Sequence, residues 1–102
     1  MTRFLESRQE QISDICARHG VSKLYLFGSA AGDQFRVGES DVDLLVEFQP
    51  MDACARVDAY FGMLEELREL LNVDVDLVVD GAVKNPYIAA EIERTKETLY
   101  AA

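Results

Sequence analysis

Three aspartates lie in apolar segments, where carboxylates are uncommon. Asp41 and Asp43 flank Val42 at the start of one apolar run, and Asp76 lies between apolar residues in another. Because strand residues two apart point the same way, Asp41 and Asp43 would share one face of a strand. Two carboxylates about 4 Å apart repel by about 4 kcal/mol at an effective dielectric of about 20. We expect a divalent cation to offset this repulsion, and hard oxygen ligands favour Mg²⁺ bound by Asp41, Asp43 and Asp76.

The sequence leaves two alternatives to this metal site open. The aspartates could instead lie on a solvated outer face of the sheet, where water offsets their charge. Asp74 would share a strand face with Asp76 and could replace it as the third ligand. A shared site requires that the two acidic strands are neighbours and that their carboxylates lie on one face.

A Gly28-Ser29 pair ends the apolar run that precedes the first two aspartates. Glycine lets the backbone approach an anion closely, and a serine at a strand-to-helix junction can contact phosphate. Such pairs usually mark turns, and this one gains weight because Asp41-Val42-Asp43 follows it after the eleven intervening residues 30–40. Arg36, in the intervening loop, could neutralise phosphate charge or could be only an exposed, solubilising side chain.

Hydrophobic periodicity predicts helices and strands along the whole chain. The expected helices are residues 4–19, residues 53–71 with Asp52 as N-cap and with Val57 and Phe61 on the apolar face, and residues 87–99. The expected strands are residues 24–27, 41–48 and 73–79. We expect Tyr87 to pack the last helix onto the sheet, with a role in an interface as the alternative. The pattern predicts an α/β (α+β) fold, with a small mixed sheet of three or more strands packed with helices, in a single domain over residues 1–102.

The charge balance limits the classes of partner. Lys and Arg total 10, Asp and Glu total 19, and the formal net charge is −9. A chain this acidic has little unspecific attraction for nucleic acid or anionic lipid, although it could be steered toward a basic protein. Its apolar runs are far shorter than the roughly 20 residues that cross a bilayer. From the charge and the short apolar runs, we expect no membrane and no direct nucleic-acid partner. Cys16 and Cys54 form no CxxC pair, so we expect reduced thiols in a cytoplasmic protein.

Taken together, these segments resemble the minimal nucleotidyltransferase (MNT) family of the DNA polymerase β superfamily. The matching segments are Leu26-Phe27-Gly28-Ser29, Ser40 through Phe48, Val75-Asp76-Leu77-Val78, Lys84-Asn85-Pro86-Tyr87 and Glu91-Ile92-Glu93-Arg94. The resemblance extends over essentially the whole chain. Its most specific element is the Gly-Ser pair followed by Asp-x-Asp and a third acidic residue.

The resemblance implies a polymerase-β-like nucleotidyltransferase core and an enzyme that uses ATP. Gly28 and Ser29 would hold the triphosphate, Asp41 and Asp43 would bind two Mg²⁺ ions, and Asp76 would complete the site and help activate the acceptor hydroxyl. Small members of the family are typically encoded beside a HEPN-domain ribonuclease toxin and act as its antitoxin. They are understood to adenylylate a tyrosine near the active site of the toxin.

Two other functions are compatible with the same residues. The chain could be a non-catalytic antitoxin that masks the toxin by binding to it. It could also transfer a nucleotide to a small molecule, although no acceptor-binding domain is visible in the sequence. The presence of all three acids and of the Gly-Ser pair favours the catalytic alternative.

Overall fold

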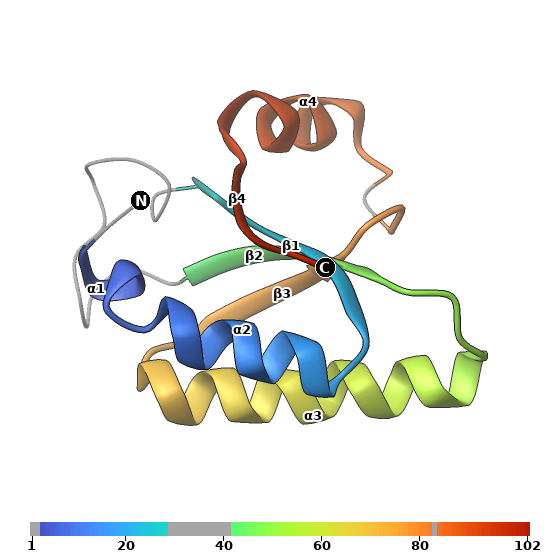
Figure 1. Cartoon of the computed structure of the whole chain (residues 1–102). Helices are drawn as coiled ribbons and strands as arrows, with labels where there is room; N and C mark the ends of the chain where they lie inside the picture. The colour runs from blue at the N-terminus through green and yellow to red at the C-terminus, as the bar shows by residue number, and fades with distance from the viewer. Residues whose placement is uncertain (1–2, 29–41, 83) are drawn as a thin grey trace.

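The computed structural model describes residues 3–28, 42–82 and 84–102, which form a four-stranded sheet flanked by helices (Figure 1). The helices are α1 (Arg3–Glu6), α2 (Gln9–Arg18), α3 (Ala53–Leu71) and α4 (Pro86–Thr95). The strands are β1 (Val21–Phe27), β2 (Val42–Phe48), β3 (Val75–Val79) and β4 (Glu97–Ala101). Within the described ranges, no helix combines the length and apolar character needed to span a bilayer.

The sheet is mixed, with strand order β3-β2-β1-β4. β1 pairs antiparallel with both β2 and β4, whereas β2 and β3 are parallel. Parallel neighbours need a crossover connection, and α3 supplies it between β2 and β3. The expected α/β fold class and mixed sheet are therefore confirmed, and the two strands that carry Asp43 and Asp76 are neighbours.

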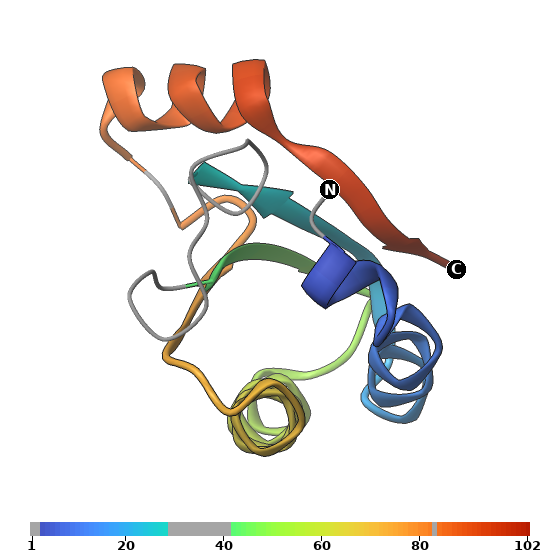
Figure 2. The same ribbon diagram turned by 90° about the vertical axis from the view of Figure 1, so that its left-hand side faces the viewer.

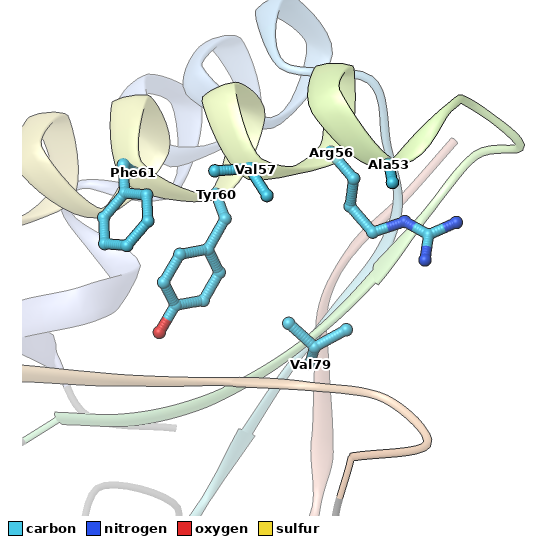
Figure 3. A pocket seen from close by; sticks show the side chains of 6 residues that line it. All are labelled: Ala53, Arg56, Val57, Tyr60, Phe61 and Val79. Atoms are coloured by element: carbon cyan, nitrogen blue, oxygen red, sulfur yellow. The ribbon is translucent and has the colours of Figure 1, made fainter.

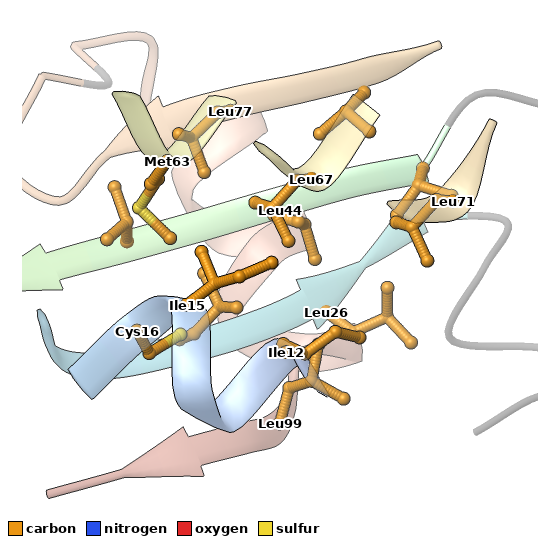
Figure 4. Close-up of a cluster of buried hydrophobic side chains, with 14 of the residues drawn as sticks. Ile12, Ile15, Cys16, Leu26, Leu44, Met63, Leu67, Leu71, Leu77 and Leu99 are labelled. Atoms are coloured by element: carbon orange, nitrogen blue, oxygen red, sulfur yellow. The ribbon is translucent and has the colours of Figure 1, made fainter. Parts of the chain in front are cut away.

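The hydrophobic core lies between the sheet and two of the helices. α2 and α3 cover one face of the sheet, and α4 lies on the opposite side (Figures 1 and 2). Alternate residues of β2, namely Val42, Leu44 and Val46, are fully buried on the α2/α3 face. They meet apolar side chains of both helices, including Ile12 and Met63 (Figure 4). The same alternation directs the odd-numbered residues of β2, which include Asp43, toward the other face.

The two ends of the chain differ from the expected pattern. The first helix is not continuous, because a turn separates α1 from α2, and the amide of Arg8 donates to the carbonyl of Leu5 at 3.1 Å. Ser7 lies in this turn, and short polar side chains favour turns over helix interiors. The expected helix through residue 99 is also wrong, because Lys96 is extended and residues 97–101 form β4. A five-residue segment of mixed polarity, Glu97–Ala101, is too short for its pattern to distinguish strand from helix, and pairing with β1 decides it.

Two expected packing faces are also wrong. The buried stripe of α3 consists of Ala59, Met63, Leu67 and Leu71, each four residues apart, whereas Val57 and Phe61 are 54% and 61% exposed. Tyr87 does not pack onto the sheet, because its side chain is 86% exposed and the buried residue of α4 is Ile92. Residues five apart on a helix are about 140° apart around its axis, so burying Ile92 turns Tyr87 outward.

Specific capping interactions fix where the longer helices begin. The Asp52 side chain accepts a hydrogen bond from the amide of Ala55 at 2.8 Å, which confirms the predicted N-cap of α3. Asn85 caps α4 by accepting from the amides of Tyr87 and Ile88, and Pro86 occupies the first turn of the helix. These caps define the start of α3, which connects β2 to β3, and of α4, on the other face of the sheet.

An ion-pair cluster joins the end of α2 to α3. Arg18 and His19 both contact the carboxylate of Glu66, one at each oxygen. Gly62 leaves the space that the His19 ring occupies, because a Cβ at this position would lie 2.8 Å from the ring. The hydrogen bond with His19, followed by that with Arg18, lowers the pKa of Glu66 below its usual range. His19 therefore does more than complement the helix dipole at the end of α2.

We expect Glu66→Gln to destabilise the fold in a pH-dependent way. Because the folded-state pKa of Glu66 is lowered, the carboxylate stabilises the fold at neutral pH, and this contribution is lost as the pH falls through the lowered pKa. At pH 7 the variant should lose about 1 kcal/mol of unfolding free energy, or roughly 4 °C in Tm. Thermal unfolding of both proteins between pH 7 and about 3 measures the difference, which should shrink with acidity. Glu69→Gln, an exposed site on the same helix, is the control, and a pH-independent difference would contradict the assignment.

Candidate functional site

Asp43 and Asp76 lie side by side at the start of two neighbouring strands. In the parallel pairing of β2 with β3, Asp43 is the direct partner of Asp76. Residues in register on neighbouring strands point to the same face, and here the adjacent Val42, Leu44, Val75 and Leu77 are all buried on the α2/α3 side. The two carboxylates therefore share the opposite face, with Asp43 half-buried and Asp76 exposed.

This placement brings two negative charges together. Like charges directly across two neighbouring strands destabilise a sheet. Both carboxylates are oxygen acceptors when ionised, and a divalent cation that prefers oxygen ligands offsets their repulsion. The face is accessible to solvent, as the alternative interpretation required, but the acids are paired on it and not dispersed along it. The donor set therefore fits Mg²⁺.

Gly28, at the end of β1, brings the backbone up against the Asp43 carboxylate. Its φ angle is +73°, which side chains other than hydrogen rarely allow. A Cβ at this position would overlap Oδ2 of Asp43. The antiparallel pairing of Phe27 with Asp43 sets this approach. Two elements of the expected motif, the glycine and the second aspartate, are therefore in direct contact.

Other expected site residues cannot be placed in the same way. Ser29, Arg36 and Asp41 lie outside the described residues. Within the part of the chain that the structure describes, no group of three or more His, Cys, Asp or Glu side chains is arranged to hold a metal ion. Of the expected three acids, Asp43 and Asp76 are thus the pair that the structure brings together.

Asp74, the alternative to Asp76, has a backbone role at the start of β3. Its carbonyl accepts a hydrogen bond from the amide of Val42 at 2.9 Å, and its side chain is exposed. This bond begins the parallel ladder and sets the register in which Asp76 meets Asp43. The register thus favours Asp76 over Asp74 as the partner of Asp43.

The sequence did not indicate a cation on the same face of the sheet. Lys96, at the junction of α4 and β4, places Nζ 4.4 Å from the ring centroid of Tyr25 and 2.9 Å from Oε1 of Glu93. The hydrogen bond to Glu93 is the main cause of the raised pKa of Lys96, which therefore remains charged at neutral pH. Tyr25 precedes Phe27 by two residues and shares its face, so a positive charge lies on the face that carries Asp43. The position of Lys96 depends on β4, which was not expected from the sequence and which pairs with the strand that carries Tyr25.

The family model described as a nucleotidyltransferase domain matches residues 8–99 of this chain. The chain belongs to the nucleotidyltransferase domain family. The matched range contains Gly28 with its neighbour Asp43, and also the pairing of Asp43 with Asp76.

This nucleotidyltransferase domain is similar to proteins of known sequence and structure. A protein of Methanocaldococcus jannaschii provisionally named a protein adenylyltransferase is 36% identical over 91 residues, covering 81% of this chain and 89% of the relative. A solved structure provisionally named a minimal nucleotidyltransferase is 31% identical, with a TM-score of 0.75 over 91% of this chain and 90% of that one. An MNT antitoxin solved with a tri-AMPylated HEPN toxin of Shewanella oneidensis is 20% identical, with a TM-score of 0.65 over 96% of this chain and 73% of that one. At that identity the likeness concerns the fold alone.

Proposed function

We propose that this chain transfers AMP from ATP to a tyrosine hydroxyl of a HEPN-domain ribonuclease toxin and thereby neutralises the toxin. The observation that carries the proposal is the carboxylate pair of Asp43 and Asp76, with Gly28 turned against Asp43. Nucleotidyl transfer needs acidic groups positioned to hold divalent cations beside a triphosphate, and little other covalent chemistry from the protein. The geometry of the described residues suits that requirement.

In the proposed site, Asp41, Asp43 and Asp76 hold two Mg²⁺ ions. Gly28 and Ser29 hold the triphosphate, and Arg36 neutralises charge on its outer phosphates. Two bound ions would bring the summed charge of ATP and three carboxylates from about −7 to about −3, and would supply charge stabilisation at the α-phosphorus.

As the tyrosine oxygen bonds to the α-phosphorus, its proton passes to the Asp76 carboxylate, the bond from the α-phosphorus to the bridging oxygen breaks, and pyrophosphate leaves. Asp76 is exposed at the edge of the sheet, so we assign it the acceptor side of the site. Asp43, half-buried against Gly28, is assigned the nucleotide side. Both substrates, ATP and an intracellular ribonuclease, place this reaction in the cytoplasm.

The comparisons support the acceptor class. The Methanocaldococcus jannaschii relative is provisionally named a protein adenylyltransferase, and it is similar over most of both chains. The family fold also occurs in an antitoxin bound to an AMPylated HEPN toxin. Asp76 is exposed on the edge strand β3, so an acceptor protein that covers this edge with its own surface is the better fit.

A transfer assay tests this function. The purified chain, α-labelled ATP, Mg²⁺ and a HEPN-domain protein from the same organism are incubated, and label on the HEPN protein is measured together with its ribonuclease activity. We expect label on a tyrosine and loss of ribonuclease activity, both dependent on Mg²⁺. If the chain suppresses the ribonuclease equally well without ATP and leaves no label, the proposal fails and masking by binding explains the protein.

A further inference from the structure

An apolar groove lies between α3 and the edge strand β3, on the side of the sheet opposite α4. It has a volume of about 300 Å³ and is lined by Ala53, Arg56, Val57, Tyr60, Phe61 and Val79 (Figure 3). We call it the α3 groove. Val57 and Phe61 are more than half exposed there, so two large apolar side chains adjoin each other on the surface of α3. Exposed apolar residues adjoining a hollow are typical of an interaction surface.

The aromatic residues of the α3 groove are held in a fixed arrangement. The Tyr60 hydroxyl donates to the carbonyl of Leu77 in β3 at 2.6 Å. The Phe61 ring stands perpendicular to that of Tyr60, with the ring centroids 5.2 Å apart. A rigid aromatic pair loses little side-chain entropy on binding, which is characteristic of anchoring positions in interfaces.

The same hydrogen bond restricts what the groove can accept. β3 is an edge strand, so the backbone groups that point away from β2 are open to an added strand. Leu77 lies between Asp76 and Val78 and directs its carbonyl outward, and the Tyr60 hydroxyl already occupies it. A strand added along β3 would have to break this bond, whereas a helix lying over Val57 and Phe61 would not. The groove therefore fits a helix better than a strand.

Charge restricts the occupant further. Arg56 is the charged residue that lines the groove itself. The border beside Phe61 is acidic, because exposed Asp58 precedes Phe61 by three residues and exposed Glu65 follows it by four. A second copy of this chain would bring another net charge of −9 to the groove, and self-repulsion opposes that contact. A helix with an apolar stripe flanked by Lys or Arg complements both the groove and its acidic border.

We propose that the α3 groove docks an amphipathic, basic-flanked helix of the acceptor protein. This inference rests on the proposed function, because it takes the acceptor to be a protein. Val79 lines the groove and follows Asp76 by three residues, or about 10 Å along the strand. An acceptor held in the groove thus reaches round the β3 edge to the carboxylate pair. Docking raises the local concentration of the acceptor hydroxyl and acts on KM more than on kcat.

Cys54 provides a reporter beside the groove. Of the two cysteines, Cys16 is buried, and burial raises its pKa to about 12, so it reacts poorly with thiol reagents. Cys54 is exposed and precedes Phe61 by seven residues, which places it about two helical turns away on the same side of α3. An environment-sensitive fluorophore on Cys54 reports occupation of the groove without depending on nucleotide transfer.

Fluorescence of the chain labelled at Cys54 gives the Kd for the HEPN-domain protein. Transfer assays with unlabelled chain give KM and kcat for the same protein. Phe61→Ser should raise Kd and KM at least about 10-fold and leave kcat within about twofold. Asp58→Asn combined with Glu65→Gln should weaken binding severalfold and reduce its dependence on salt. The matched control is Tyr87→Ser, which removes an even more exposed aromatic residue from α4 and should change each value less than about twofold.

Three results would overturn the docking proposal. The first is an unchanged Kd in Phe61→Ser, and the second is an equal loss of affinity in Tyr87→Ser. The third is a sedimentation experiment in which the original chain self-associates and Phe61→Ser does not, because the groove would then bind a second copy. The outcome is separable from that of the proposed function. Binding through the groove without label transfer would support docking and contradict the enzyme, whereas transfer that is indifferent to Phe61 would do the reverse.

Discussion

Replacing Asp43 with Asn should lower nucleotide transfer by at least about 10³-fold while the chain stays folded. Asp43 lies beside Asp76 and against Gly28, so its carboxylate is central to the proposed metal site. An amide keeps the size of the side chain but removes the negative charge that a divalent cation needs. The measurement is the rate of label transfer from α-labelled ATP at saturating Mg²⁺.

The control for this variant is Asp80→Asn, an exposed carboxylate in the turn after β3. It makes the same chemical change at the other end of the strand and should keep nearly full activity. In metal-free buffer, Asp43→Asn should also raise Tm by roughly 4 °C, because it relieves the repulsion with Asp76. Transfer by Asp43→Asn at even a tenth of the original rate would argue against the assignment.

Gly28→Ala should lower transfer by about 10²-fold and reduce unfolding free energy by about 1 kcal/mol. The residue has a φ angle of +73°, and an added Cβ would overlap the Asp43 carboxylate. The backbone strain lowers stability, whereas displacement of Asp43 lowers activity. Thermal unfolding and the transfer rate are measured on the same preparation, together with the Mg²⁺ concentration that gives half-maximal rate, which should rise.

Gly81→Ala separates these two effects. Gly81 has a φ angle of +87°, but a Cβ there would meet no atom within 4 Å. The substitution should therefore cost about the same stability and leave transfer unchanged. Equal loss of activity in the two alanine variants would mean that Gly28 acts through general strain and not through Asp43.

Much of the site could be predicted because it depends on short-range pattern. The period of two along residues 41–48 separates the buried Val42 and Leu44 from Asp43, and the apolar run around Asp76 predicts a second buried strand. The shared site required neighbouring strands with their carboxylates on one face, and the pairing of β2 with β3 meets this requirement for Asp43 and Asp76. The register that makes the two residues direct partners was not predicted. The roles of Ser29, Arg36 and Asp41 stay predictions.

The features that could not be predicted depend on contacts between distant segments. β4 forms because β1 offers an unpaired edge, and no local signal separates residues 97–101 from the preceding helix. The cation–aromatic contact of Lys96 with Tyr25 follows from that strand. The outward orientation of Phe61 and Tyr87 also follows from packing, because periodicity identifies an apolar face without giving its direction.

If Asp43 and Asp76 bind a divalent cation together, Mn²⁺ binding in the presence of a non-hydrolysable ATP analogue must depend on both carboxylates. Free Mn²⁺, followed by electron paramagnetic resonance, gives the Kd for the original chain and for three asparagine variants. We predict that Asp43→Asn and Asp76→Asn each raise the Kd at least about 10-fold, and that Asp74→Asn leaves it unchanged. Unaltered binding in Asp76→Asn, or a comparable loss in Asp74→Asn, would contradict the account.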